Sequence, residues 1–373
     1  MRITRMETFL VKPRWLFLKM HTDEGLVGLG EPLLEGRALT VAQAVAELEP
    51  YLVGKDPTQV MHHWQAMYKH AFYRGGPILT SALSGVEHAL WDLAGKALGV
   101  PVYKLMGGPL RHRIKVYGRC GGNTPEEAEQ SAREQASLGF LALKTGVGGP
   151  RPARIVETPG FVEGVAERFA AMRQGAGKEV DIAIDFHGAV SPQTSALLIK
   201  ALEPFQPMFI EEPVQCQNTE VLADLARRTH IPIATGERLY TKWGFREVLE
   251  QRAASILQPD IAHCGGIFEG RLIAGMAETY YAAIAPHCPL GPIALAACLQ
   301  MDAAIPNFLA QEHVTLGQGY LKEPFQVVDG YIPLPDKPGL GIELDEEALA
   351  DKIGHQWRNP ERYHPDDGTA IDW

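Results

Sequence analysis

The sequence predicts a (β/α) barrel of the TIM type that follows a smaller α+β unit. From Lys115 onward, short apolar runs alternate with helical stretches, and eight such runs can be counted. Three of them end in an acidic residue, Asp185, Glu211 and Glu237, with 26 residues from each to the next. Apolar runs of this kind are typical of parallel strands buried on both faces. Eight strands at this period favour a closed barrel, in which reactive groups lie at the C-terminal strand ends.

The N-terminal unit begins with strands and continues with helices. Its strands are expected at 2–11, 15–22 and 26–32, the last two joined by a turn at 23–25. Its helices are expected at about 40–53, 57–70 and 79–98. The third helical pattern is strongly apolar and stops at Gly99, as expected of a buried helix.

The barrel strands are each followed by a helix or a helix start. In order, they are expected at 115–119, 140–146, 181–187, 208–213, 231–237, 254–260, 281–287 and 308–312. The first helix has clear start signals, because Thr124, Pro125 and Glu127 supply a cap, a first-turn proline and a capping-box acid. After about residue 325 the pattern fades into a segment rich in Pro and Gly, which is expected to leave the barrel and pack on the N-terminal unit. The predicted divisions are 1–112, 113–325 and 326–373.

Composition excludes several classes of protein. Charged residues are 21% and hydrophobic residues 46% of the chain, as in a globular enzyme. The net charge of −10 argues against a nucleic-acid partner, which needs a basic surface. No apolar stretch is long enough to span a membrane, and the N-terminus lacks a signal-peptide pattern. The five cysteines form no CxxC pair, which favours reduced thiols and a cytoplasmic location.

The three acidic residues predict a cation site at the mouth of the barrel. Unpaired carboxylates on three successive strand tips would repel one another, so a divalent cation is their natural companion. His187 lies two residues after Asp185, so both side chains are expected on one face of the same strand. Zinc held by His187 and His287 is the competing hypothesis, although the other ligands are all oxygens and suit Mg²⁺ better.

Four further residues at strand ends are candidates for the chemistry. Asp260 and His287 end neighbouring strands, so the carboxylate can accept the Nδ1–H of the imidazole and leave Nε2 as a base. Lys144 and Glu312 end the second and eighth strands. Each has two interpretations of equal weight, a role toward the substrate or a salt bridge inside the mouth. Glu212 is expected to face away from Glu211, toward a neighbouring strand.

With these residues in place, the chain resembles the enolase superfamily over essentially its whole length. That resemblance implies a modified (β/α)7β barrel, an N-terminal α+β capping domain, and Mg²⁺ bound by Asp185, Glu211 and Glu237. Several strings are similar to those of the D-galactonate dehydratase family. They are FYRGGPI, DFHG, FIEEPV, ATGER, SILQPD, IAGMAE, APHCPLGPIALAACL and KPGLGIE.

The resemblance also implies an activity, the removal of water from a sugar acid. His287, held by Asp260, is expected to take the proton from C2, and His187 to protonate the departing 3-hydroxyl. Members of the mandelate-racemase branch commonly carry a KxK pattern on the second strand. Gly146 replaces its second lysine here, which argues against a racemase with a lysine base. A homo-oligomer is expected from the family and from base rates.

Substrate choice is expected to depend on loops of the capping domain. The candidates are Arg14, Trp15, Tyr73 and Arg74, for which packing between the domains is an equally supported role. Alternative functions are dehydration or epimerisation of another aldonate or aldarate, a barrel that binds sugar acids without turnover, and a metal-dependent hydrolase.

Overall fold

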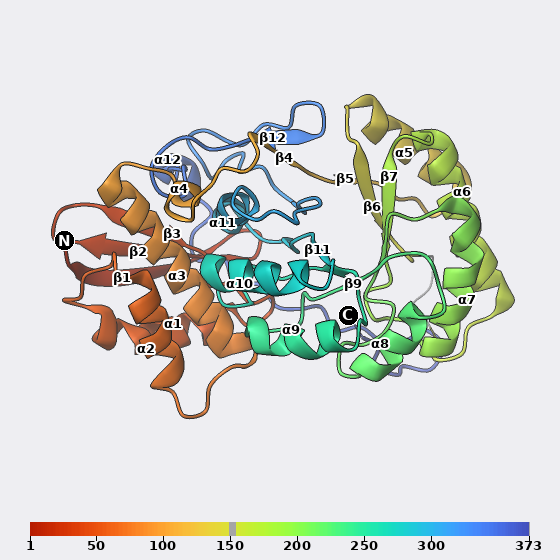
Figure 1. Ribbon diagram of the computed structural model, residues 1–373, viewed down its shortest axis with the longest axis horizontal. Helices are drawn as coiled ribbons and strands as arrows, with labels where there is room; N and C mark the ends of the chain where they lie inside the picture. The colour runs from red at the N-terminus through yellow and green to blue at the C-terminus, as the bar shows by residue number, and fades with distance from the viewer. Residues whose placement is uncertain (149–153, 373) are drawn as a thin grey trace.

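A computed structural model describes residues 1–148 and 154–372 of the chain. The N-terminal unit holds an antiparallel sheet in the order β1-β2-β3, covered by helices. Its elements are β1 (Ile3–Val11), β2 (Trp15–Thr22), β3 (Val27–Gly30), α1 (Ala38–Leu52), α2 (Val60–Lys69), α3 (Gly76–Leu98) and α4 (Val102–Leu105). The predicted strands and helices of this unit are therefore confirmed. Figure 1 shows it as the red and orange part of the molecule, to one side of the barrel.

Strands and helices then alternate, as the sequence predicts. The first half contains β4 (Arg113–Lys115), β5 (Gly118–Arg119), α5 (Pro125–Ser137), β6 (Ala142–Gly146), α6 (Pro159–Ala176), β7 (Asp181–Asp185), α7 (Pro192–Leu202) and the 3-10 helix η1 (Glu203–Phe205). The second half contains β8 (Ile210–Glu211), α8 (Thr219–Ala226), β9 (Ile233–Thr235), α9 (Thr241–Glu250), β10 (Ile256–Leu257), α10 (Ile267–Glu278), β11 (Ala283–Ile284) and α11 (Pro292–Asp302). The Thr124 hydroxyl caps α5 by accepting the Glu127 N–H.

The barrel is a parallel sheet of seven strands in the order β11-β10-β9-β8-β7-β6-β5. The expected eighth strand closes it through single bridges to both edges, from Phe308 to Ile284 and from Gln311 to Val116. A cluster of eight buried side chains fills the interior, each from one of the strands or from a residue next to it. They are Tyr117, Ala142, Ala183, Phe209, Ala234, Ile256, Ala285 and Ala310. This is the modified barrel of the predicted fold class.

The C-terminal segment returns to the N-terminal unit. It contains β12 (Tyr331–Pro333) and α12 (Glu346–Leu349). Ile353 bridges Val11, and Lys19 pairs with Glu346 at 2.5 Å, so the capping domain is completed by residues from both ends of the chain. One expected strand is divided: β4 pairs with β12 rather than continuing into β5. The exact domain limits at 112 and 325 stay predictions, and Trp373 lies outside the described residues.

Among the described residues, no helix combines the length and the apolar character that a membrane crossing requires.

Candidate active site

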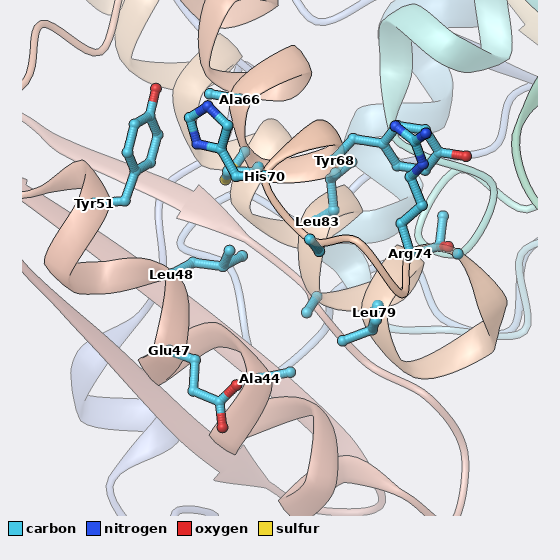
Figure 2. A pocket seen from close by; sticks show the side chains of 15 residues that line it. Ala44, Glu47, Leu48, Tyr51, Ala66, Tyr68, His70, Arg74, Leu79 and Leu83 are labelled. Carbon is cyan, nitrogen blue, oxygen red and sulfur yellow. The ribbon is translucent and has the colours of Figure 1, made fainter.

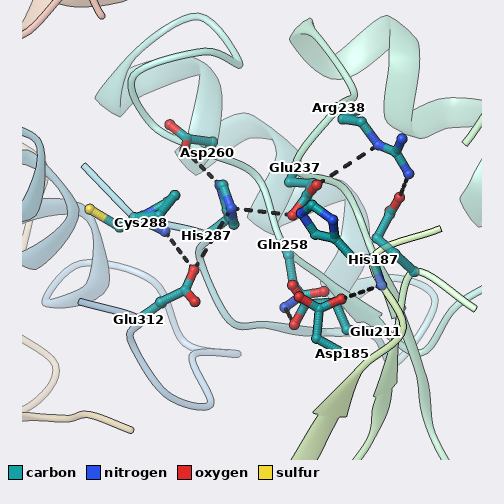
Figure 3. A network of polar contacts seen from close by, with 12 residues as sticks. Asp185, His187, Glu211, Glu237, Arg238, Gln258, Asp260, His287, Cys288 and Glu312 are labelled. Atoms are coloured by element: carbon teal, nitrogen blue, oxygen red, sulfur yellow. Dashed lines mark hydrogen bonds and ion pairs between the residues drawn. The ribbon is translucent and has the colours of Figure 1, made fainter. Parts of the chain in front are cut away.

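The three predicted acidic residues lie at neighbouring tips of the sheet, as Figure 3 shows. Asp185 ends β7 beside Glu211, which ends β8, and Glu237 follows β9 by two residues. Burial and the negative charge of Asp185 raise the pKa of Glu211 to about 7. Burial also raises the pKa of Asp185 and of Glu237, with a further rise from the charge of a neighbouring member of the trio. The three carboxylates are therefore close enough to repel one another.

Their oxygens are turned toward other partners. Glu211 accepts hydrogen bonds from Lys144 and from Gln258, both at 2.7 Å, and Asp185 accepts one from the His187 N–H at 2.6 Å. Within residues 1–148 and 154–372, no group of three or more His, Cys, Asp or Glu side chains is already arranged to hold a metal ion. Oε2 of Glu237 is buried without a hydrogen bond, and it lies 3.2 Å from Nε2 of His287. The donor set of three carboxylates is all oxygen, which fits Mg²⁺.

A buried lysine bridges two acidic residues of the mouth. The Lys144 ammonium lies 2.7 Å from Glu211 and 2.9 Å from Glu312. Burial alone would lower the pKa of Lys144, but the two carboxylates raise it well above its usual value. Burial would likewise raise the pKa of Glu312, yet Lys144 lowers it to about 2. Of the two interpretations offered for Lys144 and Glu312, the salt bridge describes this geometry.

Asp260 and His287 form the contact that their positions predict. The distance from Nδ1 of His287 to Oδ2 of Asp260 is 2.8 Å, which leaves Nε2 directed at Glu237, 3.2 Å away (Figure 3). Burial opposes protonation of His287, but Glu237 and the bond to Asp260 raise the pKa of its imidazole well above the usual value. The arrangement places an oriented imidazole beside the three acidic residues.

The strand prediction for His187 is wrong. Strand β7 ends at Asp185, and His187 lies in the following turn with φ of 55°, so it does not share a strand face with Asp185. Left-handed backbone at a residue other than glycine is uncommon and is often found at functional sites. The turn still brings the imidazole near the trio, because its charge lowers the pKa of both Asp185 and Glu237. Figure 3 shows the imidazole beside Glu237.

Glu212 turns away from the mouth and binds the next strand, as expected. Its carboxylate contacts the Arg238 guanidinium and the Thr235 hydroxyl. Arg238 lies 3.8 Å from Glu237, a looser contact than the one with Glu212. Arg238 is therefore a fixed neighbour of the acidic trio.

The structure separates the four loop candidates into two groups. Arg14 donates to the Pro289 carbonyl at 2.9 Å and pairs with Glu35 at 2.8 Å, so it connects the capping domain to the loop after His287. Trp15 begins β2 and is only 4% exposed, within the hydrophobic core. Packing between the domains is the role that the contacts of Arg14 describe, whereas Trp15 is a buried core residue.

Tyr73 and Arg74 lie on the loop between α2 and α3. Tyr73 is 87% exposed, and Arg74 stacks on Tyr68 with 5.3 Å to the ring centroid. Arg74 also lines a cavity of about 260 Å³ between α1, α2 and α3, which Figure 2 shows. This cavity belongs to the capping domain, whereas the polar cluster of Figure 3 is built on barrel strands. The structure does not bring these two residues into that cluster.

Sequence reasoning missed three residues of the site. Gln258 binds Glu211, Arg119 lies 3.9 Å from Glu312, and the imidazole of His263 lies 3.6 Å from Asp260. Gln258 and Arg119 each follow an inward-facing barrel residue by two positions, a signal that the strand period carries. His263 lies in a loop, where no such period exists.

Comparison with known proteins agrees with this architecture. The family model described as Enolase C-terminal domain-like matches residues 126–348. The model described as Mandelate racemase / muconate lactonizing enzyme, N-terminal domain, matches residues 4–107. Among solved structures, an enolase from Agrobacterium radiobacter with bound Na and L-malate is 31% identical, covers all of both chains and has a TM-score of 0.92. A mandelate racemase/muconate lactonizing enzyme from Jannaschia sp. CCS1 is 30% identical, with a TM-score of 0.90 over 96% of this chain and 99% of that one.

Two curated relatives extend over the full length of both chains. D-galactonate dehydratase of Pectobacterium atrosepticum is 45% identical, and that of Ralstonia pickettii is 46% identical. The chain therefore belongs to the enolase superfamily and, within it, to the D-galactonate dehydratase family.

Proposed function

We propose that the protein is a hydro-lyase that removes water from a sugar acid, with D-galactonate as the first candidate substrate and 2-dehydro-3-deoxy-D-galactonate as product. The observation that carries the proposal is the oriented pair of Asp260 and His287 beside three acidic strand tips. Full-length relatives named D-galactonate dehydratase support the choice of substrate.

Asp185, Glu211 and Glu237 would hold the Mg²⁺ that this reaction needs. When bound, the ion supplies a Lewis acid that stabilises negative charge developing next to the substrate carboxylate. The all-oxygen donor set and the raised pKa values of the trio support a cation here, because a bound positive charge relieves the repulsion among the three carboxylates.

The two histidines then divide the proton transfers. Nδ1 of His287 donates to Asp260, which directs Nε2 of the neutral imidazole to take the proton from C2 of the acid. A cation held by Glu237 would offset the negative charge that raises the pKa of His287, and so would favour this neutral form. His187 gives a proton to the 3-hydroxyl, which leaves as water as the C3–O bond breaks and a C2–C3 double bond forms. The resulting enol tautomerises to the 2-keto-3-deoxy acid. Glu312 contributes by holding Lys144 and the Cys288 N–H, which follows His287 directly.

The first test is a substrate panel. Purified protein with Mg²⁺ is incubated with aldonates and aldarates, and 2-keto-3-deoxy product is assayed. Formation of product from D-galactonate is expected. Absence of product with every acid would sink the dehydratase proposal, and C2 epimers without loss of water would favour an epimerase.

A second test separates the histidines. His287→Asn is expected to abolish exchange of the C2 proton with solvent deuterium and to lower turnover by about 10²- to 10⁴-fold, because one acid/base step typically contributes that factor. His187→Asn is expected to lower dehydration by a similar factor. The exposed His230 offers the matched control, since His230→Asn should leave both rates unchanged. A normal rate of C2 proton exchange in His287→Asn would show that His287 is not the base. A normal rate of dehydration in His187→Asn would show that His187 is not the acid.

A further inference from the structure

Arg119 belongs to the ring of side chains at the barrel mouth, although neither the sequence motifs nor the proton transfers involve it. It ends β5, two residues after Tyr117, which faces the barrel interior. The same two-residue step leads from Ala142 to Lys144 and from Ala310 to Glu312. Because alternate residues of a strand share a face, the Arg119 side chain starts on the inner face as well. Its guanidinium lies 3.9 Å from Oε1 of Glu312.

Arg119 differs from the other cations near the mouth in its exposure. Lys144 is buried between two carboxylates, and Arg238 is held by Glu212. Arg14 is bound to Glu35 and to a backbone carbonyl. The Arg119 side chain is 66% exposed, and its contact with Glu312 is at the outer limit of an ion pair. It therefore presents positive charge that a ligand can reach.

The order of strands sets Arg119 across the mouth from Glu237 and two strands from Asp185. Going around the sheet from β5, the next strands are β6, β7, β8 and β9, and the last three carry or precede Asp185, Glu211 and Glu237. Between them, β6 ends in the exposed Gly146, where an added Cβ would meet only ordinary contacts, at 3.6 Å from the Asp185 carbonyl. At this tip, β6 therefore places no side chain between Arg119 and Asp185.

We propose that Arg119 forms a subsite for a second carboxylate, so that the substrates include six-carbon sugar diacids as well as, or in preference to, the monoacid D-galactonate. The inference rests on the proposed function, in which one carboxylate of the substrate lies at the acidic trio. A monoacid offers Arg119 only a hydroxyl at its far end. A diacid offers a carboxylate, which a guanidinium binds with two charge-assisted hydrogen bonds.

The test compares two acids of the same configuration that differ only at C6, galactonate and galactarate. Arg119→Gln is expected to lower kcat/KM for galactarate about 10- to 100-fold more than for galactonate, mainly through KM. Arg119→Lys keeps the charge and should retain part of the preference. Arg113, on the same segment but at the opposite end of the barrel, provides the control, since Arg113→Gln should leave the ratio of the two acids unchanged.

Binding distinguishes failure of this inference from failure of the proposed function. Calorimetric titration of the His287→Asn protein in Mg²⁺ measures the affinity for both acids without turnover. If the wild type dehydrates neither acid but Arg119→Gln still weakens galactarate binding selectively, the proposed reaction fails and the subsite stands. The subsite would be overturned if Arg119→Gln lowered kcat/KM and affinity equally for both acids. It would also be overturned if the galactarate-to-galactonate ratio stayed within about twofold of wild type in both turnover and binding.

Discussion

At the scale of single residues, Lys144 sets the charge balance of the barrel mouth. Its ammonium is buried and touches carboxylates from two strands, at 2.7 Å from Glu211 and 2.9 Å from Glu312. It keeps Glu312 ionised, since the pKa of that group is lowered to about 2, whereas Glu211 titrates with a pKa of about 7. The two carboxylates differ because Glu211 also faces the negative charge of Asp185.

Replacing Lys144 by Met should therefore destabilise the protein strongly. Breaking a buried ion pair by removing one partner typically costs about 3–5 kcal/mol, because the remaining charge stays buried without compensation. Lys115→Met is the control, since that lysine forms a more exposed pair with Asp181 at 2.9 Å, where about 0–1 kcal/mol is expected. The free energy of unfolding from urea titration without Mg²⁺ provides the measurement. Equal effects in the two variants would show that Lys144 does not carry this role.

At the scale of elements, helix α3 of the capping domain holds the loop that follows Asp260. This segment comprises the loop 261–266 and the first two residues of α10, and α3 contacts it along one polar face. The pairs are Ser81 with His263 and Ser84 with the Gly265 N–H at 2.9 Å, Glu87 with the Ile267 and Phe268 N–H groups at 2.9 Å, and His88 with the Ile261 carbonyl at 3.0 Å. The capping domain thus fixes the barrel segment between Asp260 and α10.

One of these contacts makes stability depend on pH. Burial raises the pKa of Glu87 to about 8, against the lowering by its N–H donors. A carboxyl whose folded pKa exceeds its unfolded value is favoured in the protonated form. Its contribution is therefore fully present below the unfolded pKa of about 4.5 and is lost as the pH rises through about 8.

Glu87→Gln should flatten this dependence. The amide keeps a hydrogen-bond acceptor but does not ionise. The decrease in unfolding free energy between pH 5 and 8 should therefore be smaller than in the wild type, by a few kcal/mol at most. Glu31, whose pKa burial also raises to about 8 where it binds the start of α11, should give the same sign in Glu31→Gln. Unfolding free energies at several pH values measure both slopes. Slopes identical to wild type in both variants would contradict the prediction.

A close backbone approach joins β3 to the same helix. A Cβ at Gly30 would overlap the Gly85 carbonyl oxygen of α3, so no side chain fits there. Gly30→Ala is expected to lower the free energy of unfolding by about 1–3 kcal/mol or more, because backbone must move to make room. Gly275→Ala on α10 is the matched control: nothing lies within 4 Å of its Cβ, and a gain of about 0.5–1 kcal/mol is expected. Thermal unfolding of the two variants measures this difference in stability. Similar stabilities for the two variants would show that β3 and α3 can move apart at little cost.

At the scale of the whole molecule, periodic positions can be predicted from the sequence, whereas pairings between distant segments cannot. The 26-residue interval locates Asp185, Glu211 and Glu237 because strand ends of a parallel sheet meet at one edge. The alternation of strands and helices also places Asp260 next to His287. The turn at His187 was not predictable from strand alternation, because its left-handed backbone begins where the strand stops.

Contacts between residues far apart in the sequence cannot be predicted from the local sequence around either residue. Ser81 meets His263 across 182 positions, and Glu31 meets Gly291 across 260. Tyr73 and Arg74 are candidates for substrate choice from their loop alone, whereas the path of α2 and α3 takes Arg74 to the cavity of the capping domain and leaves Tyr73 exposed. The positions of residues at strand ends can therefore be predicted from the regular spacing in the sequence. The positions of loop residues can be known only from the three-dimensional fold.

Metal binding should couple the acidic trio to the stability of the whole chain. Asp185, Glu211 and Glu237 are brought together only by folding, since long stretches of sequence separate them in the unfolded chain. A cation that binds the folded trio stabilises the protein by mass action, about 2.7 kcal/mol at a concentration one hundred times its Kd. Adding Mg²⁺ to chelator-treated protein should thus raise the melting temperature measured by scanning calorimetry.

The double variant Asp185→Asn, Glu237→Gln should lose this rise, because two of three anionic ligands become neutral. Asp181→Asn should keep it, since that carboxylate lies at the opposite end of the same strand, paired with Lys115. This readout does not depend on turnover, so it separates the metal site from the choice of substrate. An equal rise in the double variant would place the bound cation elsewhere, and no rise in the wild type would remove Mg²⁺ from the proposed reaction.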